Sequence, residues 1–155
     1  MTKRVLFVCT GNTCRSPMAQ FLFARMAREA GLPWTAASAG IAATAGAPLS
    51  AGAVSALASR GLTDLRHASA PVDAAALDAA DAVYGLSTEH VDALKTRFPA
   101  AAAKVKLLRA AAGLKPIDVE DPVGEDEEIY AATAAAIEEA LEIIVEKESH
   151  APNPR

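Results

Sequence analysis

The chain has 155 residues, a hydrophobic content of 52% and a formal net charge of −4 at pH 7. This length predicts a single domain with a substantial core, and the negative charge gives no reason to expect nucleic acid or an anionic membrane as a partner. No apolar run approaches the roughly 18 residues of a membrane-spanning helix. Residues 1–4 lead into a short strand rather than into a signal-peptide core, so we expect a cytoplasmic protein.

Strands and helices alternate from the start of the chain. We predict a strand over 5–8, a helix over 17–30, a strand over 34–38, a loop over 42–49 and a helix over 50–59. The first helix carries Met18, Leu22 and Met26 at helical spacing, and Gly31 ends it. In the helix over 50–59, Val54 and Leu57 are expected to face the core.

The same alternation continues in the second half. The predicted elements are a helix over 71–80, a strand over 81–86, a helix over 87–98, a strand over 105–108 and a helix over 125–148. The last helix repeats apolar residues, among them Ile129 and Ile137. Residues 149–155 contain two prolines and no apolar pattern, so we predict a domain over 1–148 followed by a disordered tail.

Short strands separated by helices favour an α/β fold: one doubly wound, four-stranded parallel sheet with helices on both faces. Ligands of such sheets bind beyond the carboxyl ends of the strands, where a loop runs into a helix. Residues 9–16, which follow the first predicted strand, occupy that location. The sequence therefore places a candidate binding loop near the N-terminus.

This loop has the composition of a phosphate-binding loop. Gly11 and Asn12 adopt positive φ easily, while Ser16 and Pro17 predict an N-cap and a proline at the first helical position. Backbone N–H groups, the helix N-terminus and the Arg15 guanidinium can together form a nest for a tetrahedral dianion. Phosphate fits such a nest best.

Cys9 stands at the base of the predicted nest, and Arg15 follows six positions later. N–H dipoles and a guanidinium favour the thiolate, so Cys9 is predicted to be a nucleophile. The alternatives are a cysteine that serves as a small buried hydrophobe and an arginine that is a solvated charge. The strand before the loop and the helix start after it favour the catalytic interpretation.

Residues 5–19, Ser38-Ala39-Gly40, His67-Ala68-Ser69 and Asp121-Pro122-Val123-Gly124 resemble the low-molecular-weight protein tyrosine phosphatase family. The resemblance is greatest to its bacterial protein arginine phosphatase branch and extends to about residue 147. It implies a cysteine-dependent phosphatase that hydrolyses phosphoarginine residues of proteins through a cysteinyl-phosphate and releases inorganic phosphate. Hydrolysis of phosphotyrosine is the alternative. No cofactor and no metal are expected.

A general acid is also needed, because the departing group must be protonated and water must later be activated. Residues 118–128 are rich in carboxylates, and most of these are expected to be solvated or to lie in the first turn of a helix. Chemistry alone leaves Asp118 and Glu120 as alternatives to Asp121. The resemblance indicates Asp121, since the acid of these phosphatases belongs to an Asp-Pro pair before the last helix.

Other residues are expected to support the loop. Ser16 is positioned to hydrogen-bond the Cys9 sulfur, and the resemblance implies that Asn12 holds the loop together with Ser38 and His67. The alternatives are an ordinary loop serine and an ordinary core histidine. The full set of predicted phosphate-binding and loop-support residues is Thr10, Gly11, Asn12, Thr13, Cys14, Ser16, Ser38 and His67.

Substrate choice is expected to depend on Thr13 and Val123. Tyrosine-specific relatives usually carry isoleucine where this chain has Thr13, whereas threonine distinguishes the arginine phosphatases. Most relatives carry an aromatic residue where this chain has Val123, so Val123 provides less wall for a phenol ring. Glu125, in place of a second glycine, is a candidate for attracting a guanidinium.

Two rival functions belong to other classes. Arsenate reductases share the loop but need a further pair of thiols, and this chain has no cysteine outside the loop. A non-catalytic anion-binding or redox-sensing module is the second rival, because Cys14 is close enough in sequence to trap an oxidised Cys9 as a disulfide. We interpret that pair as redox regulation of an enzyme, since the thiol, the arginine and the aspartate are all present.

Overall fold

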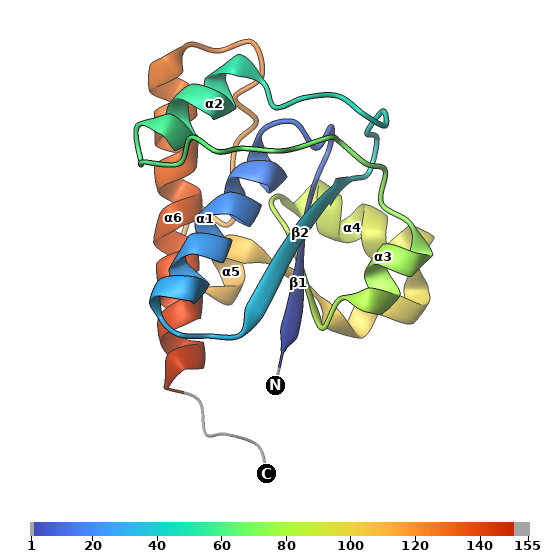
Figure 1. Cartoon of the computed structure of the whole chain (residues 1–155). Coiled ribbons are helices and arrows are strands. Elements are labelled where there is room, and N and C mark those ends of the chain that lie inside the picture. Colours follow the sequence, from blue (N-terminus) through green and yellow to red (C-terminus); the bar gives the residue numbers. More distant parts are fainter. Residues whose placement is uncertain (1, 151–155) are drawn as a thin grey trace.

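The computed structural model describes residues 2–150, in which a parallel sheet lies between two layers of helices (Figure 1). The elements in chain order are β1 (Lys3–Cys9), α1 (Arg15–Glu29), β2 (Trp34–Gly40), α2 (Ala51–Ala58), α3 (Ala74–Ala79), β3 (Ala82–Gly85), α4 (Thr88–Arg97), the 3-10 helix η1 (Pro99–Lys104), β4 (Val105–Leu107), α5 (Leu108–Ala111) and α6 (Glu127–Ser149).

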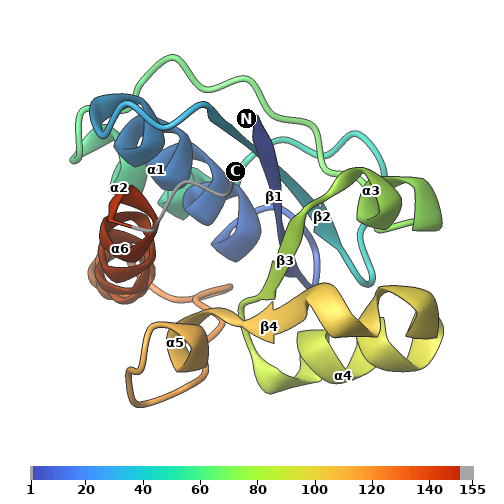
Figure 2. The ribbon, with the colours of Figure 1, turned by 90° about the horizontal axis from the view of Figure 1, so that it is seen from below.

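The sheet has the strand order β2-β1-β3-β4, and every pairing is parallel. The central strand β1 is buried on both faces, which explains its unbroken apolar sequence. Helices α1, α2, α5 and α6 lie on one face of the sheet, and α3 and α4 lie on the other (Figure 2). Val5 and Phe7 pack with the first group, and Leu6 and Val8 pack with the second. The predicted doubly wound, four-stranded parallel sheet is confirmed.

The start of α1 differs from the prediction. The helix begins at Arg15 and its N-cap is Cys14, which makes no side-chain capping bond. The predicted Ser16 cap is wrong because the Ser16 hydroxyl lies 2.9 Å from the Cys9 Sγ instead. Pro17 is therefore the third helical residue, where the missing N–H costs no intrahelical bond.

Two apolar residues expected in the core lie at the surface. Val54 and Ile129 are 43% and 42% exposed. In α2 the small residues face inward, because a Cβ on Gly52 would lie only 2.3 Å from the Tyr130 ring of α6. Side-chain volume at the contact, rather than hydrophobicity alone, sets the rotation of α2.

The last helix continues one residue beyond its predicted end, through Ser149. The rest of the predicted tail, from residue 151 onward, lies outside the described residues. Across residues 2–150 no helix is both long and apolar enough to span a membrane.

Candidate active site

The predicted binding loop connects β1 to α1 at the carboxyl edge of the sheet. Asn12 has a φ of 57°, as predicted, whereas Gly11 does not adopt the left-handed region. Cys9 is 2% exposed, and its Sγ lies 2.9 Å from the Ser16 Oγ, the predicted contact. The nucleophile candidate therefore lies at the base of the loop with a hydroxyl on its sulfur.

Asn12 is the buried residue that fixes the loop in its left-handed conformation. Its amide donates to the Ser16 Oγ at 2.8 Å, and its Oδ1 accepts the Ala70 N–H at 2.9 Å. His67 Nε2 donates to the Asn12 carbonyl oxygen at 2.7 Å. His67 thus contacts the loop through the backbone of Asn12 rather than through its side chain, and its role in loop support stays a prediction.

Ser38 does not take part in this support. Its hydroxyl donates to the Gln20 Oε1 at 2.6 Å, so the predicted contact with Asn12 is wrong. Alternation along β2 explains the difference, because Ser38 shares a face with Trp34 and Ala36, which pack in the cluster that contains α1. Ala70 provides the second partner of the Asn12 side chain.

The residues at and just after the end of β2 also contact the binding loop. Ile41 and Ala42 donate backbone N–H groups to the carbonyl oxygens of Cys9 and Thr10 at 2.9 and 3.0 Å. A Cβ on Gly40 would lie 2.4 Å from the Thr10 carbonyl oxygen. Only glycine allows this close approach, so the loop rests directly on the backbone of β2.

Thr13 lies at the α2 side of the loop. It is partly buried, and its carbonyl oxygen accepts the N–H of Ser50, the N-cap of α2, at 3.0 Å. The loop is therefore anchored to α2 as well as to β2.

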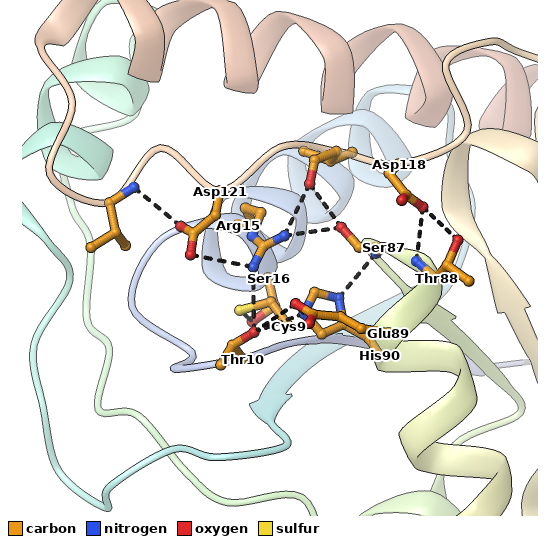
Figure 3. A network of polar contacts seen from close by, with 12 residues as sticks. Cys9, Thr10, Arg15, Ser16, Ser87, Thr88, Glu89, His90, Asp118 and Asp121 are labelled. Carbon is orange, nitrogen blue, oxygen red and sulfur yellow. Dashed lines mark hydrogen bonds and ion pairs between the residues drawn. The ribbon is translucent and has the colours of Figure 1, made fainter.

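Arg15 is a buried cation, 3% exposed, whose guanidinium is held from several directions (Figure 3). Its Nη1 donates to the Ser87 Oγ at 3.0 Å and to the Val119 carbonyl oxygen at 2.9 Å. Its Nη2 lies 3.4 Å from the Thr10 Oγ1 and 3.7 Å from the Asp121 Oδ2. These contacts fix the plane of the guanidinium.

The geometry separates the three candidate acids. Asp121 is half-exposed beside Arg15, and its Oδ1 accepts the Val123 N–H at 3.1 Å. Asp118 accepts both the backbone N–H and the hydroxyl of Thr88, at 2.8 and 2.7 Å, so it is committed to the start of α4. Glu120 is exposed. Of the three, only Asp121 forms an ion pair with Arg15 in the described part of the chain.

The sequence analysis did not find Ser87 and His90, which follow β3. His90 is fully buried, its Nδ1 accepts the Ser87 N–H at 3.0 Å, and its Nε2 lies 2.9 Å from the Thr10 Oγ1. Burial, and then the charge of Arg15, lower the pKa of His90 to about 4. The position of these residues in the sequence could have indicated them, because β3 is a neighbour of β1 and the two strands end at the same edge of the sheet.

Both cysteines are free and buried. Burial, followed by the neighbouring Cys9, raises the pKa of the Cys14 thiol. This shift favours the protonated form of the Cys14 thiol. The Cys9–Cys14 disulfide stays a prediction.

A hollow of about 340 Å³ opens beside the guanidinium. Its walls carry several carboxylates and no aromatic side chain; the lining residues are Arg15, Ser87, Glu89, Asp118, Val119, Glu120 and Asp121. Val123, at the position expected to form a wall, is 60% exposed. Within residues 2–150 no cluster of three His, Cys, Asp or Glu side chains is arranged to hold a metal ion.

Comparison with known proteins gives matches over most of the chain. Residues 4–150 match the family model described as low molecular weight phosphotyrosine protein phosphatase. A protein-arginine-phosphatase from Bacillus subtilis (strain 168) is 36% identical over 137 residues, which cover 88% of this chain and 91% of the relative. A low molecular weight protein-tyrosine-phosphatase from Streptomyces coelicolor is 38% identical over 154 residues, covering 93% and 88%.

Solved structures agree with this result. The YwlE arginine phosphatase, solved as a cysteine-to-serine mutant with a phosphorylated active-site serine, superposes with a TM-score of 0.90 at 33% identity. The match covers 95% of this chain and 96% of the other.

Proposed function

The chain belongs to the low molecular weight phosphotyrosine protein phosphatase family, and we propose that this phosphoprotein phosphatase acts on phosphoarginine residues of proteins. The observation that carries the proposal is the 36% identity, over 88% of this chain, to a protein-arginine-phosphatase. The hollow beside Arg15, whose lining contains carboxylates and no aromatic residue, also supports it.

The chemistry of the leaving group explains why this lining matters. Cleavage of a phosphoarginine P–N bond releases a guanidine that becomes a cation, and carboxylates stabilise a cation as it forms. A phosphotyrosine leaves as a phenol, which gains from stacking on an aromatic wall. Glu89, Glu120 and Asp121 therefore favour the nitrogen leaving group on electrostatic grounds.

Two displacements complete the reaction. The Cys9 thiolate attacks phosphorus, the P–N bond breaks, and Asp121 donates its proton to the departing nitrogen. Water, which gives its proton to the Asp121 carboxylate, then attacks the cysteinyl-phosphate, and the S–P bond breaks to release inorganic phosphate and restore the thiolate. Arg15 stabilises the phosphoryl oxygens in both steps.

Phosphotyrosine is the second candidate substrate, because the Streptomyces coelicolor tyrosine phosphatase is as similar in sequence as the arginine phosphatases are. The exposed Val123 argues against it, since no aromatic ring is present at that position to stack on a phenol. The expected cytoplasmic location stays a prediction.

The test compares kcat/KM for a phosphoarginine peptide and for the same peptide carrying phosphotyrosine, with Cys9→Ser as the blank. We expect a preference for phosphoarginine that reverses in Thr13→Ile, because the added methylene and the lost hydroxyl suit a flat ring. A preference of the wild-type protein for phosphotyrosine would overturn the proposal.

A further inference from the structure

His90 is a buried histidine with a defined tautomer. A backbone N–H can only donate, so the 3.0 Å contact from the Ser87 N–H requires the His90 Nδ1 to accept. In the neutral ring the hydrogen then lies on Nε2, which is 2.9 Å from the Thr10 Oγ1. His90 therefore donates to the hydroxyl of the residue that follows the nucleophile.

The Thr10 hydroxyl is thereby oriented. Its oxygen faces two donors, the His90 Nε2 and the Arg15 Nη2, at 2.9 and 3.4 Å. Its single hydrogen remains to be donated, and its acceptor is the Glu89 Oε1 at 3.4 Å. The Glu89 side chain is 67% exposed, so a stronger acceptor can replace it.

A phosphoryl group bound by Arg15 supplies that acceptor. We propose that His90 is a positioning residue that, by donating to the Thr10 hydroxyl, turns the hydroxyl hydrogen toward the phosphoryl oxygens. The proposal rests on phosphoryl transfer at Cys9, but it does not depend on the choice between arginine and tyrosine. Figure 3 shows Thr10 below the Arg15 guanidinium and beside His90, with dashed lines that join its hydroxyl to both.

The role requires a neutral ring. The charged groups around it are Glu89 on its own helix, Arg15 of α1, and Asp118 and Asp121 of the segment before α6. Burial and Arg15 oppose protonation more strongly than the two aspartates favour it. A protonated ring would carry a hydrogen on Nδ1 and lose the Ser87 bond, so the arrangement holds at neutral pH.

Two substitutions separate the two hydrogen bonds. In His90→Asn, the amide oxygen lies near the position of Nδ1 and can still accept from Ser87, but no donor reaches Thr10. In His90→Gln, the amide N–H lies near the position of Nε2 and can still donate to Thr10. Both variants, Thr10→Val and the double variant H90N/T10V are assayed with one aryl phosphate and with the phosphoarginine peptide.

We expect His90→Asn to lower kcat/KM about tenfold, the value of one hydrogen bond, and His90→Gln to recover most of that loss. The double variant should be no slower than Thr10→Val, because both substitutions remove the same bond. Equal losses in the Asn and Gln variants, or additive losses in the double variant, would overturn the proposal. Circular dichroism and Tm confirm folding of each variant.

A second readout does not use turnover. Inorganic phosphate is titrated into each protein, and its Kd is measured by NMR. We expect His90→Asn to weaken phosphate binding and His90→Gln to retain it; unchanged binding in His90→Asn would contradict the role. If the wild-type protein hydrolyses neither substrate, the proposed function fails, while the phosphate titration still decides the role of His90.

Discussion

Arg15 is a buried cation whose contacts converge from three segments of the chain. Replacement by lysine keeps the charge but cannot reach the Ser87 hydroxyl, the Val119 carbonyl and a bound phosphoryl group at once. We expect Arg15→Lys to lower kcat/KM for an aryl phosphate by about 100-fold or more without unfolding the protein. A loss of less than about threefold would show that the planar arrangement of the guanidinium N–H donors is unimportant for catalysis.

Ser16 affects the second chemical step more than the first. Its hydroxyl lies 2.9 Å from the Cys9 sulfur, which must leave as a thiolate when the cysteinyl-phosphate is hydrolysed. We expect Ser16→Ala to lower kcat about tenfold and to leave a fast first turnover. Rapid-quench kinetics with an aryl phosphate measure both phases; a first turnover slowed as much as the steady state would contradict this role.

The site residues that could be predicted from the sequence are those that lie close together along the chain. Cys9, Asn12 and Arg15 belong to one short loop whose residue types already suggest its chemistry. Ser87 and Val119 reach Arg15 from 72 and 104 positions away, and no local pattern marks them. The Ser38 prediction was wrong because strand alternation turns that side chain toward Gln20.

At the scale of elements, the contact between β2 and the binding loop limits residue size. An added Cβ on Gly40 would lie 2.4 Å from the Thr10 carbonyl oxygen, whereas one on Gly11 would lie 3.9 Å from its nearest neighbour. We expect Gly40→Ala to lower the free energy of unfolding by about 2 kcal/mol or more and to reduce activity.

Gly11→Ala is the matched control, since it adds the same methyl group to the loop that rests on Gly40, without a close contact. Its Tm should remain near that of the wild-type protein. Urea denaturation of the two variants measures the difference, and equal stabilities would contradict the packing argument.

The order of helices and strands was predictable, because the spacing of apolar residues and the positions of turn residues indicate where each element lies. Helix ends and rotations were less predictable. The start of α1 depends on where the Ser16 hydroxyl finds a partner, and the rotation of α2 depends on how closely Gly52 approaches Tyr130. Two short helices, η1 and α5, flank β4 and are too short to show a period.

At the scale of the whole molecule, the buried His90 makes stability depend on pH. The pKa of its ring is about 4 in the folded protein, below its ordinary value of 6.5, so the unfolded chain binds a proton first as the pH falls. Stability is therefore complete above pH 6.5 and decreases between pH 6.5 and about 4, by at most about 3 kcal/mol.

His90→Asn is the control for this prediction because asparagine does not titrate. Its free energy of unfolding should change less over the same pH range than that of the wild-type protein. Urea titrations of both proteins at several pH values provide the comparison, and parallel pH profiles would show that another group is responsible.

The proposed reaction transfers a phosphoryl group from phosphoarginine to Cys9. The most direct measurement mixes the wild-type protein with a phosphoarginine peptide, quenches it within the first turnover and locates the phosphoryl group by mass spectrometry. We predict one phosphoryl group on Cys9, none in Cys9→Ala, and little labelling from the matched phosphotyrosine peptide. Labelling by the phosphotyrosine peptide alone, or release of phosphate without any labelled Cys9, would contradict this reaction.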